Sequence, residues 1–472
     1  MPKRNLAWIL VITMITLLMW QLPQIIAGRD AVYRAFGPLV DARAQIRKRY
    51  VDEVADQTLA NAAVEAGIRA MIEKLGDPHA VYLNDAEYTR FKSRTDGNFG
   101  GVGVDVWAAD GGLEVLSRAA GSPAAVAGVL PGDVITHIDG RSISGMPLVD
   151  SVTNLLNGPA ETRVALTVVR PSDPPQSPPR QIICERKEIH IDPVRGWSRS
   201  STGGWRYMLD AEYGIGYVRL TKFTPDADQR IDAEVERLLR SKMAGLILDL
   251  RENTGGLLDS AREIADRFLE SGLIVRTAGR KADEKQWFAM RDGTYPDFHM
   301  AILVNASSAS AAEIVAGALR DHHRAAVVGE RTYGKGSVQE VVELDRQGGA
   351  IKLTTAYYYL PSGQCIHRTP KTIEEKNWGV GPTIPVELTD SQRAKWLAAW
   401  RDLGREPVTT QPTTQMASAP ASQPLEEREA ELAEASLLAA DLQLAKAVEY
   451  LRGKIRPGAT TRPASGPTTR GS

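Results

Sequence analysis

The chain has 472 residues, enough for two or three domains, and 43% of them are apolar, which is sufficient for sizeable hydrophobic cores. Basic residues number 57 and acidic residues 58, so the formal charge of -1 offers no general attraction to nucleic acid or anionic lipid. The two cysteines, Cys184 and Cys365, fit no metal-binding or redox spacing. The sequence leaves a disulfide between them open and favours two packed free thiols.

The N-terminal segment, residues 1–28, is predicted to be a membrane anchor. Lys3 and Arg4 precede a mostly apolar, uncharged run from Leu6 to Ala27, and a helix over that run would be about 33 Å long, sufficient to cross a bilayer. The positive charge before the run places the rest of the chain on the extracytoplasmic, periplasmic side. A cleaved signal peptide is the alternative, but residues 25–28 match a small-x-small cleavage site poorly, and we favour a retained anchor.

Residues 31–96 carry apolar side chains at helical spacing, including Ile46, Tyr50, Val51 and Val54 on one face. This pattern predicts an N-terminal helical segment. Residues 97–188 change to a β-rich pattern with one helix. The expected elements are strands at Val102–Val106, Leu113–Val115 and Arg163–Arg170, a helix at Leu148–Leu156 and an exposed loop at Pro171–Pro179.

Together with LPGDVI at Leu130–Ile135, the pattern over residues 97–188 resembles a PDZ domain. The resemblance implies that one loop binds the terminal carboxylate of a peptide through successive backbone N–H groups, while the peptide adds as a strand to an open sheet edge. The residues that match this loop are Gly101, Val102, Gly103 and Val104.

Residues 189–400 alternate strands and helices, which indicates an α/β core. Within it, Gly245–Leu269 predicts a strand, a turn and a helix. The apolar run Leu246–Leu248 leads into a turn that contains Gly255 and Gly256. Two glycines at a strand end expose backbone N–H groups to an approaching oxygen atom.

Asn305–Gln339 is the stretch most indicative of catalysis. An apolar strand leads into a turn of small residues that ends at Ser310, and a helical pattern follows. Strand, tight turn and helix is an arrangement that lifts a serine hydroxyl clear of the backbone. Downstream, Lys335 lies between Gly334 and Gly336. A lysine accepts the serine proton only when neutral, which requires burial to lower its pKa from about 10.4 toward about 7.

SSASAAEI around Ser310 and GERTYGKGSVQ around Lys335 resemble the Ser–Lys pair of the carboxy-terminal processing peptidases, also called tail-specific proteases. GDPHAVYLNDAEY at Gly76–Tyr88 and NWGVGPTIPVEL at Asn377–Leu388 resemble further parts of that family, so the likeness extends over residues 31–390. The chain departs from the family pattern at Thr254, where proline is usual, and at Thr383, where aspartate is usual.

The resemblance implies a serine endopeptidase on a crotonase-like α/β core, a mixed sheet with helices, preceded by an inserted PDZ domain. The N-terminal segment predicts that this enzyme is exported. Ser310 would be the nucleophile, Lys335 the general base, and Gln339 would orient Lys335. No metal or cofactor is implied. The expected substrates are proteins or peptides with accessible C-termini, and the membrane is a partner through the anchor. A homo-oligomer or an adaptor protein is left open.

The same resemblance implies an oxyanion hole. One donor would be the N–H of Gly255 or Gly256, and the other the N–H of Ala311; removing such a donor usually lowers the rate by about 10²–10³-fold. His322 and His323 with Asp321 suggest a Ser–His–Asp site instead. They follow a helix about 18 Å long, which places them too far from Ser310. His79 could also suggest a catalytic role, but the sequence favours a structural histidine in a loop.

Beyond the core, Pro407–Pro424 is rich in Thr, Ser, Gln and Pro, and residues 401–424 are predicted to be a disordered linker. Leu425–Ile455 has an apolar stripe at i, i+4 spacing and predicts one amphipathic helix, and residues 456–472 are predicted to be disordered. Two other function classes stay open: a PDZ scaffold with an inactive core, and an acyl- or lipid-binding protein on the same core.

Overall fold

The structure is a computed structural model, and it divides the chain into two compact units. One comprises Met1–Ala86 with Val341–Leu353, and the other Glu87–Glu340 with Thr354–Ser472. The described residues are 13, 36–95, 98–119, 121–146, 155–174, 176–190, 192–281, 283–344, 349–407 and 425–457. Apart from Thr13, the predicted anchor at Leu6–Ala27 lies outside them. Among these residues, no helix has both the length and the apolar character needed to cross a membrane.

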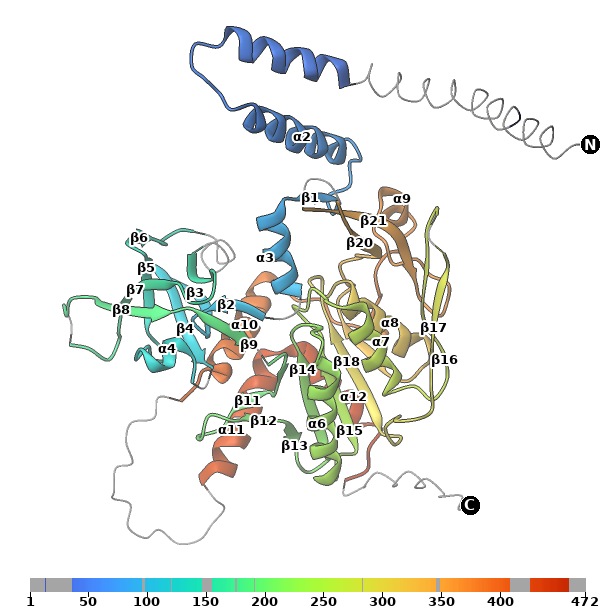
Figure 1. The fold of residues 1–472 in the computed structure, drawn as a ribbon. Coiled ribbons are helices and arrows are strands. Elements are labelled where there is room, and N and C mark those ends of the chain that lie inside the picture. The colour runs from blue at the N-terminus through green and yellow to red at the C-terminus, as the bar shows by residue number, and fades with distance from the viewer. Residues whose placement is uncertain are drawn as a thin grey trace, which may run out of the picture. The chain divides into compact units, whose positions relative to one another are not determined.

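Residues 36–95 are mainly helical, as predicted, but residues 50–55 are not (Figure 1). Tyr50, Val51 and Val54 lie in that non-helical stretch, so the helical face that they were expected to share with Ile46 does not form. A short strand, which the prediction lacked, is also present. Residues 36–49 are helical, α2 spans Asp56–Glu73, and the ion pair of Arg43 with Asp56 joins the two segments. The strand is β1 (Val81–Leu83), which pairs antiparallel with Ala350–Lys352 at the start of β21 (Ala350–Tyr359). The helix α3 (Asp85–Thr95) follows β1 and belongs to the second unit from Glu87 onward.

Residues 98–190 of the second unit form the predicted β-rich module. A six-stranded antiparallel sheet has the order β3-β4-β5-β7-β8, with β6 beside β5, and β2 pairs with β9. Its buried side chains include Val102, Leu113, Ile135 and Leu166. The helix predicted at Leu148–Leu156 falls mostly outside the described residues. The elements are β2 (Asn98–Gly101), β3 (Val104–Ala109), β4 (Gly112–Arg118), α4 (Pro123–Val126), β5 (Val134–Ile138), β6 (Arg141–Ser142), β7 (Arg163–Val169), β8 (Arg180–Glu185) and β9 (Lys187–His190).

The α/β core is built on a seven-stranded mixed sheet of order β10-β14-β15-β18-β19-β22, with β13 also paired to β14. The pairs from β14 to β22 are parallel, whereas β10 and β13 run antiparallel to β14. This confirms the predicted mixed sheet with helices; the narrower likeness to crotonase folds stays a prediction. The strands are β10 (Val194–Arg195), β13 (Met208–Asp210), β14 (Ile215–Leu220), β15 (Gly245–Asp249), β18 (His299–Val304), β19 (Ala326–Gly329) and β22 (Ile384–Pro385).

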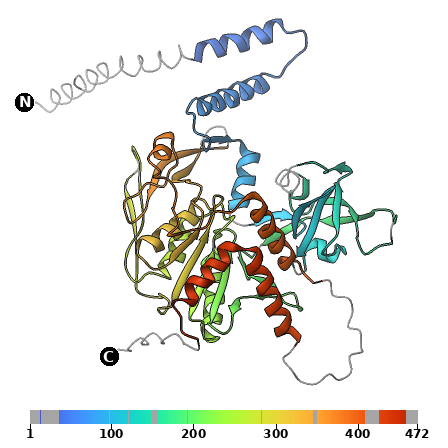
Figure 2. The same ribbon diagram turned by 180° about the vertical axis from the view of Figure 1, so that it is seen from behind.

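Helices cover both faces of this sheet (Figures 1 and 2). Leu246 and Leu248 of β15 belong to the core cluster that packs α6, α7 and α8, whereas Ile247 belongs to the cluster that packs α10, α11 and α12. Burial on both faces explains why these strands are continuously apolar in sequence. The helices are α6 (Ala227–Arg240), α7 (Leu258–Asp266), α8 (Ala311–Asp321), α10 (Asp390–Gly404), α11 (Leu425–Ala440) and α12 (Leu442–Arg452).

A smaller sheet completes the core. The strand β16 (Gly272–Ala278) pairs antiparallel with β17 (Lys285–Ala289) and with Tyr357–Tyr359 at the end of β21, while β20 (Ser337–Glu343) also pairs with β21. The remaining elements are β11 (Ser198–Arg199), β12 (Trp205–Arg206) and α9 (Pro370–Glu374). Cys184 and Cys365 are free cysteines, as favoured from the sequence, and burial raises the pKa of the Cys184 thiol to about 11.

The C-terminal region differs from its prediction. The expected single helix over Leu425–Ile455 is two helices, α11 and α12, because Asp441 leaves the helical conformation and its side chain caps α12 by accepting a hydrogen bond from Leu444 N. Both helices contribute to the core, through Leu437, Leu444 and Leu451. Residues 401–404, assigned to the linker, continue α10. Residues 408–424 and 458–472 lie outside the described residues.

Candidate active site

Ser310 occupies the turn between β18 and α8 that the sequence predicted. Its φ is +57°, a value that non-glycine residues rarely adopt and that often marks functional sites. The turn before it is fixed by Ser308, which is fully buried: its Oγ accepts from Asn305 N at 3.0 Å and donates to Leu250 O at 2.7 Å. The helix α8 begins at the next residue, Ala311. The surroundings therefore hold Ser310 in an otherwise costly conformation.

Glu313, which the sequence analysis did not single out, joins the serine turn to the lysine loop. Its Oε2 accepts hydrogen bonds from Ser310 N and Lys335 N, each at 2.8 Å. Its Oε1 accepts from Gly334 N at 2.7 Å and from Thr332 Oγ1. Burial raises the pKa of the Glu313 carboxyl above its ordinary value, and the hydrogen bonds donated to it oppose that rise.

Lys335 lies in a close-packed loop, as its two flanking glycines suggested. Gly334 has a φ of +89°, and a Cβ there would come within 2.7 Å of Trp378 Cδ1. A Cβ at Gly336 would come within 2.4 Å of His367 N. Lys335 itself is half-buried. A side chain at either glycine would therefore displace the loop that carries the lysine.

Gln339 follows on β20 and is also half-buried. Its Nε2 donates to Ser337 Oγ at 2.8 Å and lies 3.4 Å from Thr354 Oγ1. These contacts fix the orientation of the amide group. Its predicted role, orienting Lys335, stays a prediction.

The two glycines of the turn after β15 differ in how their N–H groups are used. Gly255 lies against the serine turn, because a Cβ there would come within 2.8 Å of Ser310 Cβ and 3.0 Å of Ala311 N. Its N–H, however, donates to Asn253 Oδ1 at 2.8 Å. Within the described part of the chain, neither Gly256 N nor Ala311 N has a hydrogen-bond acceptor. Of the two glycine N–H groups, that of Gly255 is therefore already occupied, and the oxyanion role predicted for this turn stays a prediction.

The predicted carboxylate loop connects β2 to β3. Gly103 has a φ of +75°, and a Cβ there would come within 2.4 Å of Ser122 Cβ. The carbonyl groups of Val102 and Gly103 accept from Ala124 N and Ala119 N, both at 2.9 Å. The N–H groups of Val102 and Gly103 have no acceptor among the residues that the structure describes. Unpaired successive N–H groups are what a carboxylate requires.

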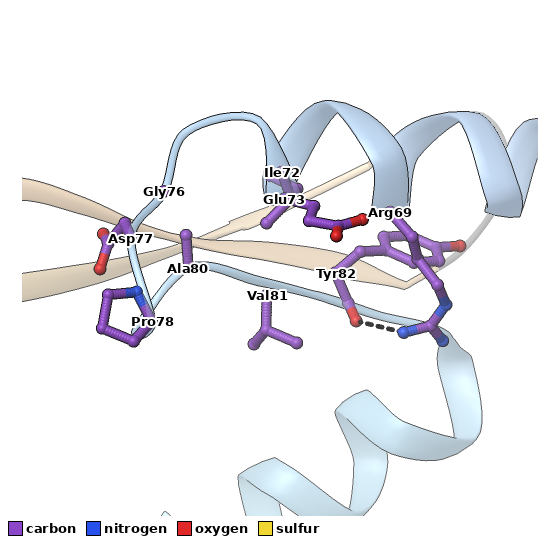
Figure 3. A pocket seen from close by; sticks show the side chains of 9 residues that line it. All are labelled: Arg69, Ile72, Glu73, Gly76, Asp77, Pro78, Ala80, Val81 and Tyr82. Carbon is purple, nitrogen blue, oxygen red and sulfur yellow. Dashed lines mark hydrogen bonds between the residues drawn. The ribbon is translucent and has the colours of Figure 1, made fainter.

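The histidines lie where the sequence placed them. His322 caps the C-terminal end of α8, and its Nε2 lies 2.7 Å from Leu273 O. His79 lies in the first unit, where its N–H donates to Asp77 Oδ1 at 2.8 Å. A hollow of about 450 Å³ in the same unit is lined by Arg69, Tyr82 and their neighbours from α2 to β1 (Figure 3). None of the predicted catalytic residues lines it.

Comparison with known proteins gives the family. A model of peptidase family S41 matches residues 214–386, and a PDZ domain model matches residues 114–170. A carboxy-terminal-processing protease of Bartonella bacilliformis is 37% identical over 360 residues, which is 75% of this chain and 76% of that protein. The chain belongs to peptidase family S41.

Other members of the family are similar to this chain. A probable CtpA-like serine protease of Staphylococcus haemolyticus is 32% identical over 305 residues, 64% of this chain and 58% of that protein. A solved structure, the photosystem II D1 C-terminal processing protease, has 30% sequence identity and a TM-score of 0.44, covering 74% of this chain and 92% of its own. As a carboxy-terminal-processing protease of family S41, the chain is a serine-type peptidase that carries a PDZ domain.

The sequence contained a signal for Glu313, the residue of this site that the sequence-based prediction missed. Ser310 and Glu313 have the spacing of a capping box, in which the acid at the third helical position accepts from the N-cap N–H. The N–H groups of Gly334 and Lys335 also bind this carboxylate, and no short-range pattern predicts that contact.

Proposed function

We propose that the protein is an exported serine endopeptidase in which Ser310 is the nucleophile and Lys335 the general base. The observation that carries the proposal is the acceptor that the two residues share. The backbone nitrogens of Ser310 and Lys335 each lie 2.8 Å from Glu313 Oε2, so these two atoms are no farther apart than twice that distance. A lysine side chain is long enough to reach a serine hydroxyl over that separation.

In the proposed reaction, Ser310 Oγ attacks the scissile carbonyl carbon while neutral Lys335 takes the hydroxyl proton. The N–H groups of Ala311 and Gly256 would donate to the oxyanion. The protonated Lys335 then gives its proton to the leaving amine, the C–N bond breaks, and an acyl-enzyme remains. Water, deprotonated by Lys335, releases the second product and restores Ser310.

The proposed substrates are proteins and peptides with accessible C-termini, held by the PDZ domain. Supporting this are the N–H groups of Val102 and Gly103, which have no acceptor among the described residues and suit a terminal carboxylate. The strand β3 also lies at the edge of its sheet as described, which suits an added strand. Export rests on the charged and apolar pattern of residues 1–28. Retention of the protein in the cytoplasmic membrane after a high-salt wash would support the anchor, and release would argue against it.

A fluorophosphonate probe tests the catalytic proposal. We expect the wild-type protein to be labelled once, at Ser310, as located by mass spectrometry of its peptides, and the Ser310→Ala variant to stay unlabelled. An inactive scaffold or an acyl-binding protein would not be labelled in either form. Labelling at another serine would contradict the assignment.

A further inference from the structure

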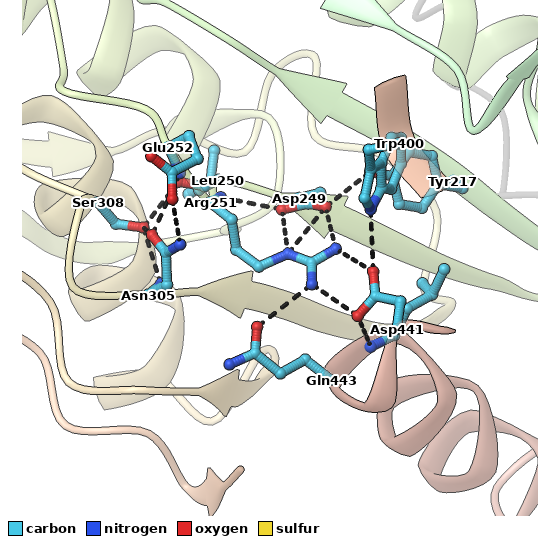
Figure 4. A network of polar contacts seen from close by, with 11 residues as sticks. Tyr217, Asp249, Leu250, Arg251, Glu252, Asn305, Ser308, Trp400, Asp441 and Gln443 are labelled. Atoms are coloured by element: carbon cyan, nitrogen blue, oxygen red, sulfur yellow. Dashed lines mark hydrogen bonds and ion pairs between the residues drawn. The ribbon is translucent and has the colours of Figure 1, made fainter. Parts of the chain in front are cut away.

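A buried charged cluster lies on the face of the central sheet that α10, α11 and α12 cover (Figure 4). Asp249, Arg251 and Asp441 are each fully buried. Arg251 Nη2 lies 2.6 Å from Asp249 Oδ2 and 2.7 Å from Asp441 Oδ2, and Arg251 Nη1 lies 2.8 Å from Asp441 Oδ1. The Arg251 guanidinium thus binds two carboxylates. One is at the end of β15, and the other lies at the junction of α11 and α12, 190 residues from Arg251 in the chain.

The cluster has two carboxylates but one guanidinium, so one negative charge is not balanced by Arg251. Hydrogen bonds stabilise this charge. Tyr217 Oη donates to Asp249 Oδ2 at 2.7 Å, while Trp400 Nε1 and Leu444 N donate to Asp441 at 3.0 and 2.9 Å. Burial alone would raise the pKa of Asp249, but the neighbouring guanidinium charges, chiefly that of Arg251, and the hydrogen bonds donated to this carboxylate together hold that pKa below its ordinary value. Removing one member would leave a buried charge unpaired, so the cluster tolerates little displacement.

Residues on both sides of Arg251 in the chain contact the serine turn. Leu250 O accepts from Ser308 Oγ at 2.7 Å. On the other side, Asn253 O accepts from Ala309 N at 2.9 Å, and Asn253 Oδ1 accepts from Gly255 N at 2.8 Å. The segment that holds Arg251 is therefore bound to the residues that immediately precede Ser310 and to the glycine turn.

We propose that Asp441 and Arg251 are positioning residues for the reaction: the C-terminal helix pair α11–α12, through Asp441, fixes the segment from Leu250 to Gly256 and with it the Ser310 turn. The inference rests on the proposed function of Ser310. It makes the C-terminal helices part of the active-site framework, although they lie on the opposite face of the sheet from α8. Attachment of α12 does not itself require the cluster, because Arg452 Nε also binds Asp210 Oδ2 at 2.7 Å.

The test compares Asp441→Asn with wild type in the full-length protein. We expect kcat on a short reporter peptide, and the rate of fluorophosphonate labelling at Ser310, to fall by about 10–100-fold, because small misplacements of reacting groups have effects of that size. KM and the final labelled fraction should stay near wild type. A loss of folded protein would instead lower the labelled fraction and leave the rate of the remainder unchanged.

Arg452→Gln is the matched control, because it weakens another contact of α12 with the core. We expect a lower melting temperature with an unchanged labelling rate. If Asp441→Asn fails to fold, Trp400→Phe is the deciding variant, since it keeps an aromatic ring at this position and removes one donor to Asp441. A fall of about threefold to tenfold in labelling rate is expected.

Wild-type labelling rates in Asp441→Asn, or in Trp400→Phe if that variant decides, would overturn the inference. An equal slowing by Arg452→Gln would also overturn it, because attachment of the helix would then matter and not the contact with Arg251. Failure of the proposed function has a different signature: the wild-type protein itself would not be labelled at Ser310.

Discussion

Ser310 and Lys335 donate their backbone N–H groups to the same atom, Oε2 of Glu313, over 2.8 Å each. The turn that carries the proposed nucleophile and the loop that carries the proposed base are thus held by one buried carboxylate. Since Gly334 N and Thr332 Oγ1 bind its other oxygen, loss of this carboxylate would leave several buried donors without an acceptor.

Glu313→Gln is therefore expected to reduce kcat on a peptide reporter and to lower the free energy of unfolding by about 1–3 kcal/mol, because an amide cannot accept all of these hydrogen bonds. The measurements are steady-state kinetics and urea unfolding. Glu340→Gln, an exposed substitution on β20, is the control. An unchanged kcat in a folded Glu313→Gln protein would show that the shared acceptor is dispensable.

The raised pKa of Glu313 also predicts a pH dependence of stability. The folded state binds the Glu313 proton more tightly than the unfolded state, whose ordinary value is 4.5. The contribution of Glu313 to the free energy of unfolding is thus greatest below pH 4.5 and falls as the pH rises through the raised value. The difference in unfolding free energy between wild type and Glu313→Gln should decrease with pH over that interval. A difference that grows with pH would mean that the folded-state pKa is lowered.

Lys335→Arg is expected to be as inactive as Lys335→Ala, because a guanidinium keeps its proton in proteins and cannot serve as a general base. The wild-type rate should rise with pH as the lysine loses its proton. Both are measured with a peptide reporter between neutral and alkaline pH. Near-wild-type cleavage by Lys335→Arg would require another base.

The serine and lysine segments could be predicted because each is encoded locally. The turn of small residues between an apolar strand and a helix indicated the position of Ser310, and two glycines indicated the close-packed loop of Lys335. The contact of Asp441 with Arg251 could not be predicted, because it joins residues 190 positions apart and depends on how α11 and α12 pack. The end of α11 at Asp441 could not be predicted either, because the helical spacing of apolar residues continues through this position.

The proposed carboxylate loop of the PDZ domain gives a further prediction. A peptide with a free C-terminal carboxylate should bind more tightly than the same peptide with an amidated terminus, as measured by fluorescence anisotropy. Gly103→Ala should weaken binding of the free peptide, because a Cβ at that position would come within 2.4 Å of Ser122 Cβ and the backbone has a φ of +75°. Gly111→Ala, also at positive φ but with nothing nearby, is the matched control. Equal binding of the two peptides would exclude carboxylate recognition.

Binding of such a peptide is also predicted to regulate the enzyme. If the PDZ domain has positions that differ in access to Ser310, a tail peptide shifts the balance only by its difference in affinity for them. We expect a free-carboxylate peptide to stimulate cleavage of a separate short reporter, and its amidated form to do so less. A deletion of residues 97–187 that stays folded yet loses reporter cleavage would show that the domain helps to build the active site.

The most direct test of the account is cleavage of casein by the Ser310→Ala protein beside wild type and Ser307→Ala. We expect Ser310→Ala to abolish cleavage and to keep the wild-type melting transition, while Ser307→Ala, three residues away in the same turn, should retain most of the activity. Cleavage by a folded Ser310→Ala protein at a rate near wild type would contradict the account.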